Sequence, residues 1–431
     1  MNIVLLTNTF TPHVGGVARS VQAFTDEYRR RGHRVLVVAP EFPDTPARET
    51  DVVRIPAIQN FNASDFSVAL PFPTGLKDTL DDFGPDIVHS QHPFLLGMTA
   101  VRIARHRGLP LVFTHHTLYE EYTHYVPGDS PVLKRFVIEL ATHYANLSDQ
   151  VFAPSESIRD LLVERGVTRP ILVVPTGVQV ERFARGDGQA FRERHAIPPD
   201  AFVVGHLGRL AEEKNLGFLA ASVAAFLGVR PRAHFLVVGA GPAEENIRRT
   251  FAEAGLTERL HVAGVLEREA LADGLHAMDV FAFASRSETQ GMVLTEAMAA
   301  GLPVVALDAP GVREVVEDGA NGRLLAQEDA AAFADALEWV ASRNTEARTA
   351  IVRGARDTAE AYSMPRSAER ALTCFERLTP ELGESSAAEE KGWEQVMARI
   401  RTEWDIVRSL TRAGDGALSE GRTEGRAGGG R

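Results

Sequence analysis

The sequence has a single cysteine, Cys374, which excludes an intramolecular disulfide framework. It also lacks long apolar runs, because stretches such as Val35–Ala39 are far shorter than the roughly 18 residues that span a bilayer. The chain opens on the strand-like segment Ile3–Leu6, without a basic and then apolar signal segment. We therefore expect a cytoplasmic protein, for which attachment to the inner face of the cell membrane stays open.

Positive charge is scarce, since 46 Lys and Arg stand against 58 Asp and Glu and give a net charge of -12. This balance argues against a nucleic-acid partner, because phosphate affinity comes from clustered cations. The sequence also contains no Asp-x-Asp motif of the kind that holds a divalent metal. Any phosphate site must therefore be local, and we predict no metal site.

Short β-branched apolar runs alternate with segments of helical length, which is typical of parallel sheets. A polar, breaker-rich stretch at 176–196 separates two series of such strands, and we expect the linker there. The strands are predicted at Ile3–Leu6, Val35–Ala39, Ile87–Val88 and Leu111–Phe113, and then at Phe202–His206, Phe235–Val238, His261–Val262, Val280–Phe283 and Val304–Ala306. The fold class is therefore α/β, with doubly wound domains at 1–180 and 196–362.

The last 51 residues differ in composition. Apolar side chains recur there at intervals of three and four and predict an amphipathic helix that packs on the body or meets a membrane. A low-complexity tail rich in Gly and Arg follows and should be disordered. The helix positions are Trp393, Met397, Ile400, Trp404, Val407 and Leu410, and the tail is 421–431.

Glycines follow one strand in each series. Gly15 and Gly16 directly precede a helix, where backbone N–H groups can approach a phosphate, although an ordinary tight turn explains a lone pair equally well. Gly239 and Gly241 also follow a strand, but Glu244 stands where a dinucleotide fingerprint has its third glycine. This difference counts against a nicotinamide dehydrogenase.

Charged residues follow two strands of the second series. Arg209 and Lys214 come after Phe202–His206, at an edge where two cations suit a diphosphate. Glu288 follows the strand Val280–Phe283, and Glu296 should lie about one turn into a helix that begins near Met292. Carboxylates accept hydrogen bonds from the hydroxyls of sugars and ribose. Gly291 would let the next amides reach a phosphate at the helix start.

These motifs, together with Glu317-Asp318-Gly319-x-Asn321-Gly322, resemble the retaining family 4 glycosyltransferases over about residues 1–378. The resemblance implies the GT-B fold: two Rossmann-like domains facing a cleft, with a final helix at 363–380 crossing back onto the first. It also implies that Glu288 and the amides of Met292 and Val293 hold the donor sugar. Glu296 would hold the ribose, and Arg209 and Lys214 would hold the diphosphate. The backbone from Val262 to Val265 would contact the base. His276 stands where the family usually has Tyr.

The stretch Thr114–Tyr125 gathers imidazole, aromatic and carboxylate groups directly after a strand, which is hard to explain as core. It resembles the diacylglycerol glucosyltransferases within family 4. By that resemblance His116 contacts the donor sugar near the reacting carbon, as a catalytic residue beside Glu288. His115 is the alternative for this role, because the sequence does not decide which imidazole faces the donor. The acceptor side is expected at His115, Tyr119, Glu120, Tyr122 and His124.

We therefore expect a metal-independent, retaining hexosyltransferase that uses a sugar nucleotide and needs no cofactor. The expected reaction moves glucose from UDP-glucose to a lipid hydroxyl such as that of diacylglycerol. A soluble sugar or sugar-phosphate acceptor is the first alternative, and a nucleotide-sugar epimerase or nucleotide-binding regulatory protein is the second. Basic residues at Tyr28–Arg34 and Arg102–Arg107 would let the N-terminal domain dock on an anionic membrane, although residues at helix ends also complement the helix dipole.

Overall fold

The computed structural model describes residues 1–379 apart from 14, 47, 59–67, 70–74, 122–129 and 287. The helix expected between Trp393 and Leu410 and the Gly/Arg-rich tail lie outside the described residues, as do Tyr122 and His124.

The N-terminal domain is built on a parallel sheet of seven strands in the order β3-β2-β1-β6-β7-β8-β9. A two-stranded pair, β4 with β5, is separate from this sheet. The strands are β1 (Asn2–Leu6), β2 (Arg34–Pro40), β3 (Val52–Ile55), β4 (Ala57–Ile58), β5 (Val68–Ala69), β6 (Ile87–Ser90), β7 (Leu111–Thr114), β8 (Gln150–Ala153) and β9 (Ile171–Val173). The helices are α1 (Gly16–Arg30), α2 (Leu76–Phe83), α3 (Leu96–Arg107), α4 (Pro131–Leu147) and α5 (Glu156–Glu164).

The C-terminal domain repeats this plan with six parallel strands in the order β12-β11-β10-β13-β14-β15. The strands are β10 (Phe202–Leu207), β11 (Ala233–Val238), β12 (Leu260–Gly264), β13 (Val280–Phe283), β14 (Val304–Leu307) and β15 (Gly322–Leu325). The helices are α6 (Val180–Phe183), α7 (Gly188–Arg194), α8 (Leu216–Val229), α9 (Glu244–Glu253), α10 (Arg268–His276), α11 (Met292–Ala299), α12 (Ala330–Ala341) and α13 (Thr345–Ala361), with 3-10 turns η3 (Glu212–Lys214) and η4 (Thr257–Arg259). A further helix, α14 (Met364–Leu378), follows this domain in sequence. The predicted pair of doubly wound parallel sheets is confirmed.

Both faces of each sheet are buried, which explains why the strands read as continuous apolar runs. In β1, Val4 and Leu6 pack against α2, α3 and α5, whereas Ile3 and Leu5 point to the opposite face. That opposite face is covered by α1 and by α14, which brings buried side chains from the far end of the described chain. The N-terminal core is therefore incomplete without residues that follow the C-terminal domain in sequence.

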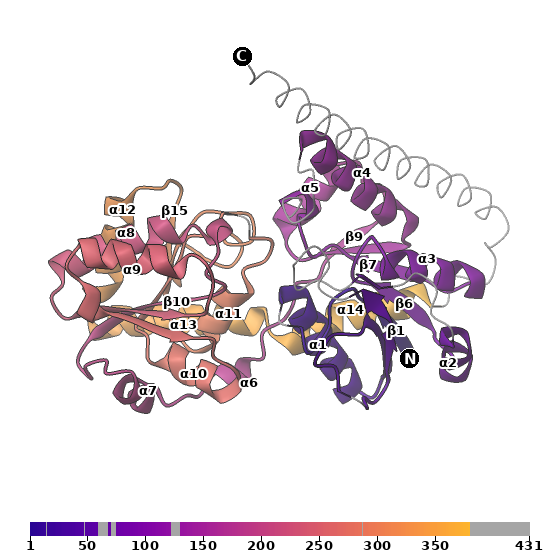
Figure 1. Cartoon of the computed structure of the whole chain (residues 1–431), viewed down its shortest axis with the longest axis horizontal. Helices are drawn as coiled ribbons and strands as arrows, with labels where there is room; N and C mark the ends of the chain where they lie inside the picture. Colours follow the sequence, from indigo (N-terminus) through magenta and orange to yellow (C-terminus); the bar gives the residue numbers. More distant parts are fainter. Residues whose placement is uncertain are drawn as a thin grey trace, which may run out of the picture.

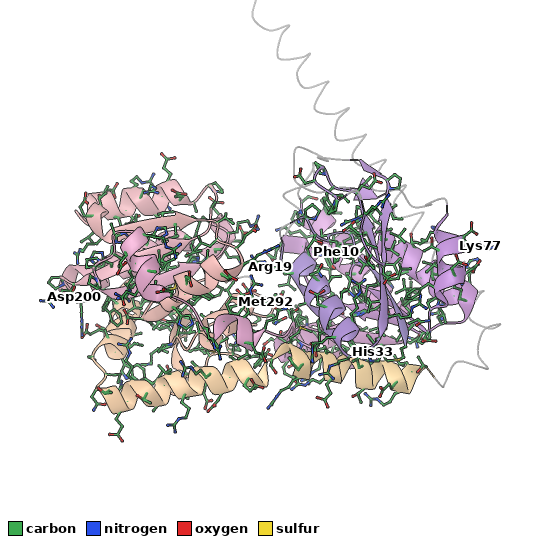
Figure 2. The ribbon with its side chains drawn as sticks, turned by 90° about the horizontal axis from the view of Figure 1, so that it is seen from below. Phe10, Arg19, His33, Lys77, Asp200 and Met292 are labelled. Carbon is green, nitrogen blue, oxygen red and sulfur yellow. The ribbon has the colours of Figure 1, made fainter. Side chains whose placement is uncertain are left out.

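The final helix crosses back as the family resemblance implies. Figure 1 shows α14 next to α1 in the N-terminal domain, and Figure 2 shows α13 and α14 along one side of the molecule, under one domain and then the other. Phe375 of α14 stacks at 5.9 Å on Phe152 and meets the ring edge of Tyr28 at 5.8 Å. Sequence periodicity alone does not specify which sheet α14 covers.

The chain passes between the domains twice, and the two passages are bonded to each other. Val178 donates its N–H to the carbonyl of Tyr362 at 2.9 Å and accepts from the N–H of Met364 at 2.8 Å. Gly177 lies so close that a Cβ there would stand 2.2 Å from the Cα of Met364. A side chain at this position would therefore separate the two passages.

The segment 176–196, where we expected an open linker, instead packs into the C-terminal domain. It contains α6 and α7, whose Phe183 and Phe191 are buried in that domain's core. Gly188 belongs to this breaker-rich stretch, but a Cβ there would meet the carbonyl oxygen of His276 at 2.2 Å. His276 also contacts the carbonyl of Phe183 through Nε2 at 2.9 Å. Close packing, rather than flexibility, explains this glycine.

Replacing Gly177 by Ala should lower the free energy of unfolding by about 1–3 kcal/mol, because the new methyl group overpacks a backbone contact. Chemical denaturation of Gly177→Ala measures the change. Gly228→Ala is the matched control, since a Cβ there meets nothing within 4 Å and Ala favours its helix. Equal stability of Gly177→Ala and the wild type would contradict the tight passage.

Candidate functional site

The carboxyl ends of the two sheets face one another. Thr289, in the loop after β13, donates its hydroxyl to the carbonyl of His116, which follows β7, at 3.1 Å. In each sheet the strand order reverses at the centre, between β1 and β6 and between β10 and β13. Ligands of open α/β sheets bind at such switch points. The loops and helix starts after β1, β10 and β13 carry half of the residues predicted from the sequence.

Glu288 and Lys214 meet across the C-terminal switch point. Lys214 Nζ lies 3.1 Å from Glu288 Oε2, although 74 residues separate them in sequence. The other carboxylate oxygen accepts the N–H of Gly291 at 3.2 Å. Both side chains are mostly buried. The carboxylate of Glu288 is therefore held in one orientation before any ligand arrives.

Arg209 lies in the loop after β10 and forms an ion pair with Glu213 one turn later. The predicted glycines act on this loop through packing. A Cβ at Gly239 would stand 1.9 Å from the carbonyl oxygen of Gly208, and one at Gly241 would stand 2.3 Å from that of Leu210. Both glycines also have positive φ, at 135° and 151°. They therefore let the Arg209 loop lie against the loop after β11.

Helix α11 starts at Met292, as predicted, after Gly291 with φ of 75°. Met292 and Val293 form its first turn, and Glu296 lies in the second. Glu296 is 9% exposed, and its Oε2 has no hydrogen-bond partner among the described residues. Burial raises its pKa, and Arg19 and Arg182 oppose that shift. A buried carboxylate oxygen without a partner is suited to accept a ligand hydroxyl.

Arg19 is a site residue that the sequence reasoning missed. It comes from the first turn of α1 and lies 3.9 Å from Glu296 of the other domain. Figure 2 shows Arg19 and Met292 at the facing sides of the two domains. The sequence could have indicated Arg19 by its position, three residues after Gly16 on the helix that follows the glycine pair. This spacing does not reveal what lies opposite the helix.

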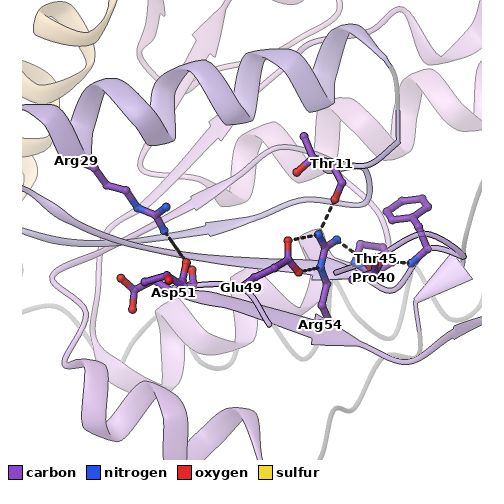
Figure 3. Close-up of polar contacts among 9 residues, drawn as sticks. Thr11, Arg29, Pro40, Thr45, Glu49, Asp51 and Arg54 are labelled. Carbon is purple, nitrogen blue, oxygen red and sulfur yellow. Dashed lines mark hydrogen bonds and ion pairs between the residues drawn. The ribbon is translucent and has the colours of Figure 1, made fainter. Parts of the chain in front are cut away.

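Arg54 of β3 holds the loop that precedes the Gly15-Gly16 turn, at Thr11. Arg54 binds Glu49 through two nitrogens at 2.6 and 2.7 Å, and donates to the carbonyls of Thr11 at 2.5 Å and Pro40 at 2.9 Å (Figure 3). This ion pair is nearly buried. A Cβ at Gly16 would meet nothing within 4 Å, so the space beside it is open among the described residues. The loop before α1 is thus fixed by Arg54, and the space beside Gly16 at the start of the helix is open.

The two adjacent imidazoles occupy different environments. His115 is 1% exposed and packs against Phe113 and Tyr119, with ring centroids 6.0 and 5.4 Å away. His116 is partly exposed, and its Nε2 donates to the Gln91 carboxamide oxygen at 2.7 Å. Burial lowers the pKa of His115 to about 4 and that of His116 well below its usual range. Both rings are therefore neutral near pH 7, and His116 is the more accessible.

The other residues expected on the acceptor side are held inside the N-terminal domain where they are described. Tyr119 packs against Phe94 with ring centroids 4.9 Å apart. Glu120 is 8% exposed and forms an ion pair with Arg165 at the end of α5. Its carboxylate is thus committed to a structural contact, which local sequence did not indicate because Arg165 is 45 residues away. Val265, expected near the base, is 65% exposed directly after β12.

Two features are absent from the described residues. No cluster of three or more His, Cys, Asp or Glu side chains could hold a metal ion in this part of the chain. Among the helices that the structure describes, none is long and apolar enough to cross a membrane.

Comparison with known families covers both domains. The family described as Glycosyltransferase Family 4 matches residues 14–182, and that described as Glycosyl transferases group 1 matches residues 187–358. A GDP-mannose-dependent alpha-mannosyltransferase of Mycobacterium tuberculosis is 31% identical over 338 residues, which cover 75% of this chain and 84% of that protein. The chain belongs to the family 4 glycosyltransferases. It is therefore a hexosyltransferase with the GT-B fold.

Two further similarities bear on this glycosyltransferase. The alpha-monoglucosyldiacylglycerol synthase of Streptococcus pneumoniae is 29% identical over 330 residues, which cover 75% of each protein. The solved structure of Anabaena HepE in complex with UDP and glucose superposes with a TM-score of 0.69 at 22% identity, covering 88% of this chain and all of that one. The second similarity supports the fold alone.

Replacing Glu288 by Ala should lower the turnover number by about 100-fold or more, because the carboxylate is prepositioned beside Lys214 and the start of α11. Steady-state kinetics with the donor measure this loss, and circular dichroism should show an intact fold. Glu244→Ala is the control, since Glu244 forms only an exposed ion pair within α9. Near-normal turnover of a folded Glu288→Ala enzyme would contradict the site.

Proposed function

We propose that the enzyme transfers glucose from UDP-glucose to the hydroxyl of a membrane lipid such as diacylglycerol, with retention of the anomeric configuration. The observation that carries the proposal is the similarity to the pneumococcal synthase, whose name states glucose as the sugar and diacylglycerol as the acceptor. The stretch after β7, which resembles the diacylglycerol glucosyltransferases in sequence, supports it, and this stretch lies at the loop after β13, where the carbonyl of His116 accepts the Thr289 hydroxyl.

In the proposed reaction, the bond between C1 of glucose and the diphosphate oxygen breaks. The acceptor oxygen bonds to C1 on the same face, and its proton passes to the departing phosphate, so UDP leaves. Arg209 and Lys214 would bind the diphosphate through strong charge-assisted hydrogen bonds. We propose that these cations and the start of α11 replace a metal ion, and that the enzyme needs no further cofactor.

Glu288 and His116 would act on the sugar from opposite domains. The prepositioned carboxylate of Glu288 can accept hydrogen bonds from glucose hydroxyls. His116, with its Nε2 proton engaged by Gln91, presents Nδ1 as an acceptor in the neutral ring. Glu296 would take the ribose hydroxyls through its unpartnered oxygen. The protein thus contributes positioning and charge stabilisation rather than a nucleophile.

The basic clusters expected to dock on a membrane are largely used within the fold. Arg29 donates to the carbonyl of Val35 at 2.8 Å, and Figure 3 shows it reaching the Asp51 backbone as well. Arg31 binds Glu27 of its own helix at 2.8 Å, and Arg107 binds Asp81 of α2 at 2.6 Å. These engagements weaken the part of the proposal that rested on those clusters.

The first turn of α4 is a better candidate for membrane contact at the inner face of the cell membrane. Val132 there is 67% exposed, and Lys134 and Arg135 follow it on the same helix. An exposed apolar residue next to cations suits the interface of an anionic bilayer. The helix belongs to the N-terminal domain, in which the acceptor is expected.

The acceptor proposal predicts faster glucose transfer to diacylglycerol than to glucose, glucose 6-phosphate or inositol phosphate. Radiolabelled UDP-glucose and GDP-mannose, each assayed with every acceptor in mixed micelles containing EDTA, make the comparison. Product with UDP-glucose and lipid, undiminished by EDTA, is the expected result. Preference for a soluble acceptor or for GDP-mannose would replace the lipid or glucose assignment, and a strict requirement for added magnesium would contradict metal independence.

The membrane proposal predicts that the enzyme sediments with anionic phosphatidylglycerol vesicles at low salt and less at high salt, because surface attraction is screened. Val132→Asp should reduce sedimentation several-fold by placing a negative charge at the interface. Val229→Asp is the matched control, since Val229 is 74% exposed in the other domain. Equal sedimentation of the two variants would exclude α4 as the contact.

A further inference from the structure

Gln290 joins the donor loop to the connection between the domains. Its carboxamide oxygen accepts the N–H of Thr176 at 2.7 Å, and its amide nitrogen donates to the carbonyl of the same residue at 2.6 Å. Gln290 is 5% exposed and Thr176 is 4% exposed. One side chain thus satisfies both backbone groups of a residue 114 positions away, as a neighbouring strand would.

The contact extends into the N-terminal domain. The Thr176 hydroxyl lies 2.7 Å from the hydroxyl of Ser20 on α1, in a buried pair. Ser20 directly follows Arg19, the residue 3.9 Å from Glu296. A chain of hydrogen bonds therefore runs from the donor loop through Thr176 to the helix that faces Glu296.

The loop that carries Gln290 is braced from behind. Gly311 donates its N–H to the carbonyl of Glu288 at 2.9 Å, and a Cβ at Gly311 would stand 2.3 Å from the backbone nitrogen of Gln290. On the other side, Thr289 binds the carbonyl of His116. Glu288, Thr289 and Gln290 are consecutive, so a shift of one moves the others.

We propose that Gln290 is a positioning residue that sets the register between the two domains. By fixing Thr176 and α1 to the donor loop, it places Arg19 opposite Glu296 and holds His116 beside Glu288. This role rests on the proposed function for its effect on turnover, but the contact between the domains is independent of which sugar or acceptor is used.

The geometry requires an amide of this length. Glutamate has the same shape but no N–H to donate, so its carboxylate would face the carbonyl oxygen of Thr176. Methionine has a similar length and makes neither bond, which leaves a buried N–H and a buried carbonyl without partners. The two substitutions remove the link by different physical means while nearly conserving volume.

The test compares Gln290→Glu and Gln290→Met with the wild type and with Gln327→Glu, whose glutamine is exposed in the same domain. The turnover number of both Gln290 variants should fall by about 100-fold, as expected when reacting groups are displaced by about 1 Å. The dissociation constant of UDP should change less than about threefold by calorimetry, because the expected diphosphate and ribose ligands lie within one domain. Gln327→Glu should match the wild type in both.

Small-angle scattering separates the positioning role from the activity. Both Gln290 variants should show a larger radius of gyration than the wild type without ligand, since one of the links between the domains is lost. Ser20→Ala removes only the hydroxyl contact and should give a smaller loss of turnover, which keeps the proposal testable if a Gln290 variant unfolds. Unchanged scattering and turnover in the folded variants would overturn it. A wild type that fails to bind UDP would instead contradict the proposed donor, and the scattering result would still decide the role of Gln290.

Discussion

The backbone contact at Gly177 is the constraint on which the rest of the structure depends. There the outgoing chain passes within bonding distance of the returning chain, and Val178 is paired with both Tyr362 and Met364. Because the passages are joined, α14 reaches the N-terminal sheet and completes its core with Phe375 and its neighbours. The stability of the first domain is therefore linked to the position of the second.

The joined passages also determine which loops meet at the candidate site. Each sheet presents the loops at its carboxyl end, and joining the domains brings these loops together, so that His116 contacts Thr289 and Arg19 approaches Glu296. Glu288 and Lys214 are already oriented within the C-terminal domain. Prepositioned charges of this kind need little rearrangement when charge develops on a departing diphosphate. The groups proposed to hold the donor thus come from one domain, and the other supplies groups that face them.

The sequence predicted where the charged residues of the C-terminal domain lie relative to their own strands. Arg209 and Lys214 follow β10, Glu288 follows β13, and the helix after Gly291 begins at Met292 as expected. In the N-terminal domain, the sequence did not predict the partners of the charged residues. Glu120 turned out to bind Arg165, and the basic segments predicted for membrane docking bind their own fold. Local sequence shows that a charge is present but does not show which distant partner neutralises it.

The sequence by itself determined the fold class and most of the parallel strands, namely β1, β2, β6, β7 and β10 to β14, but not β3, β8, β9 or β15. Hydrophobic periodicity and strand-to-loop position are local properties, and buried parallel strands have a recognisable pattern. Only the tertiary structure decided that 176–196 packs as helices, that Arg19 faces Glu296 and that Gln290 binds Thr176. These features depend on contacts between segments up to 277 residues apart, which arise from the packing of whole domains rather than from local preference.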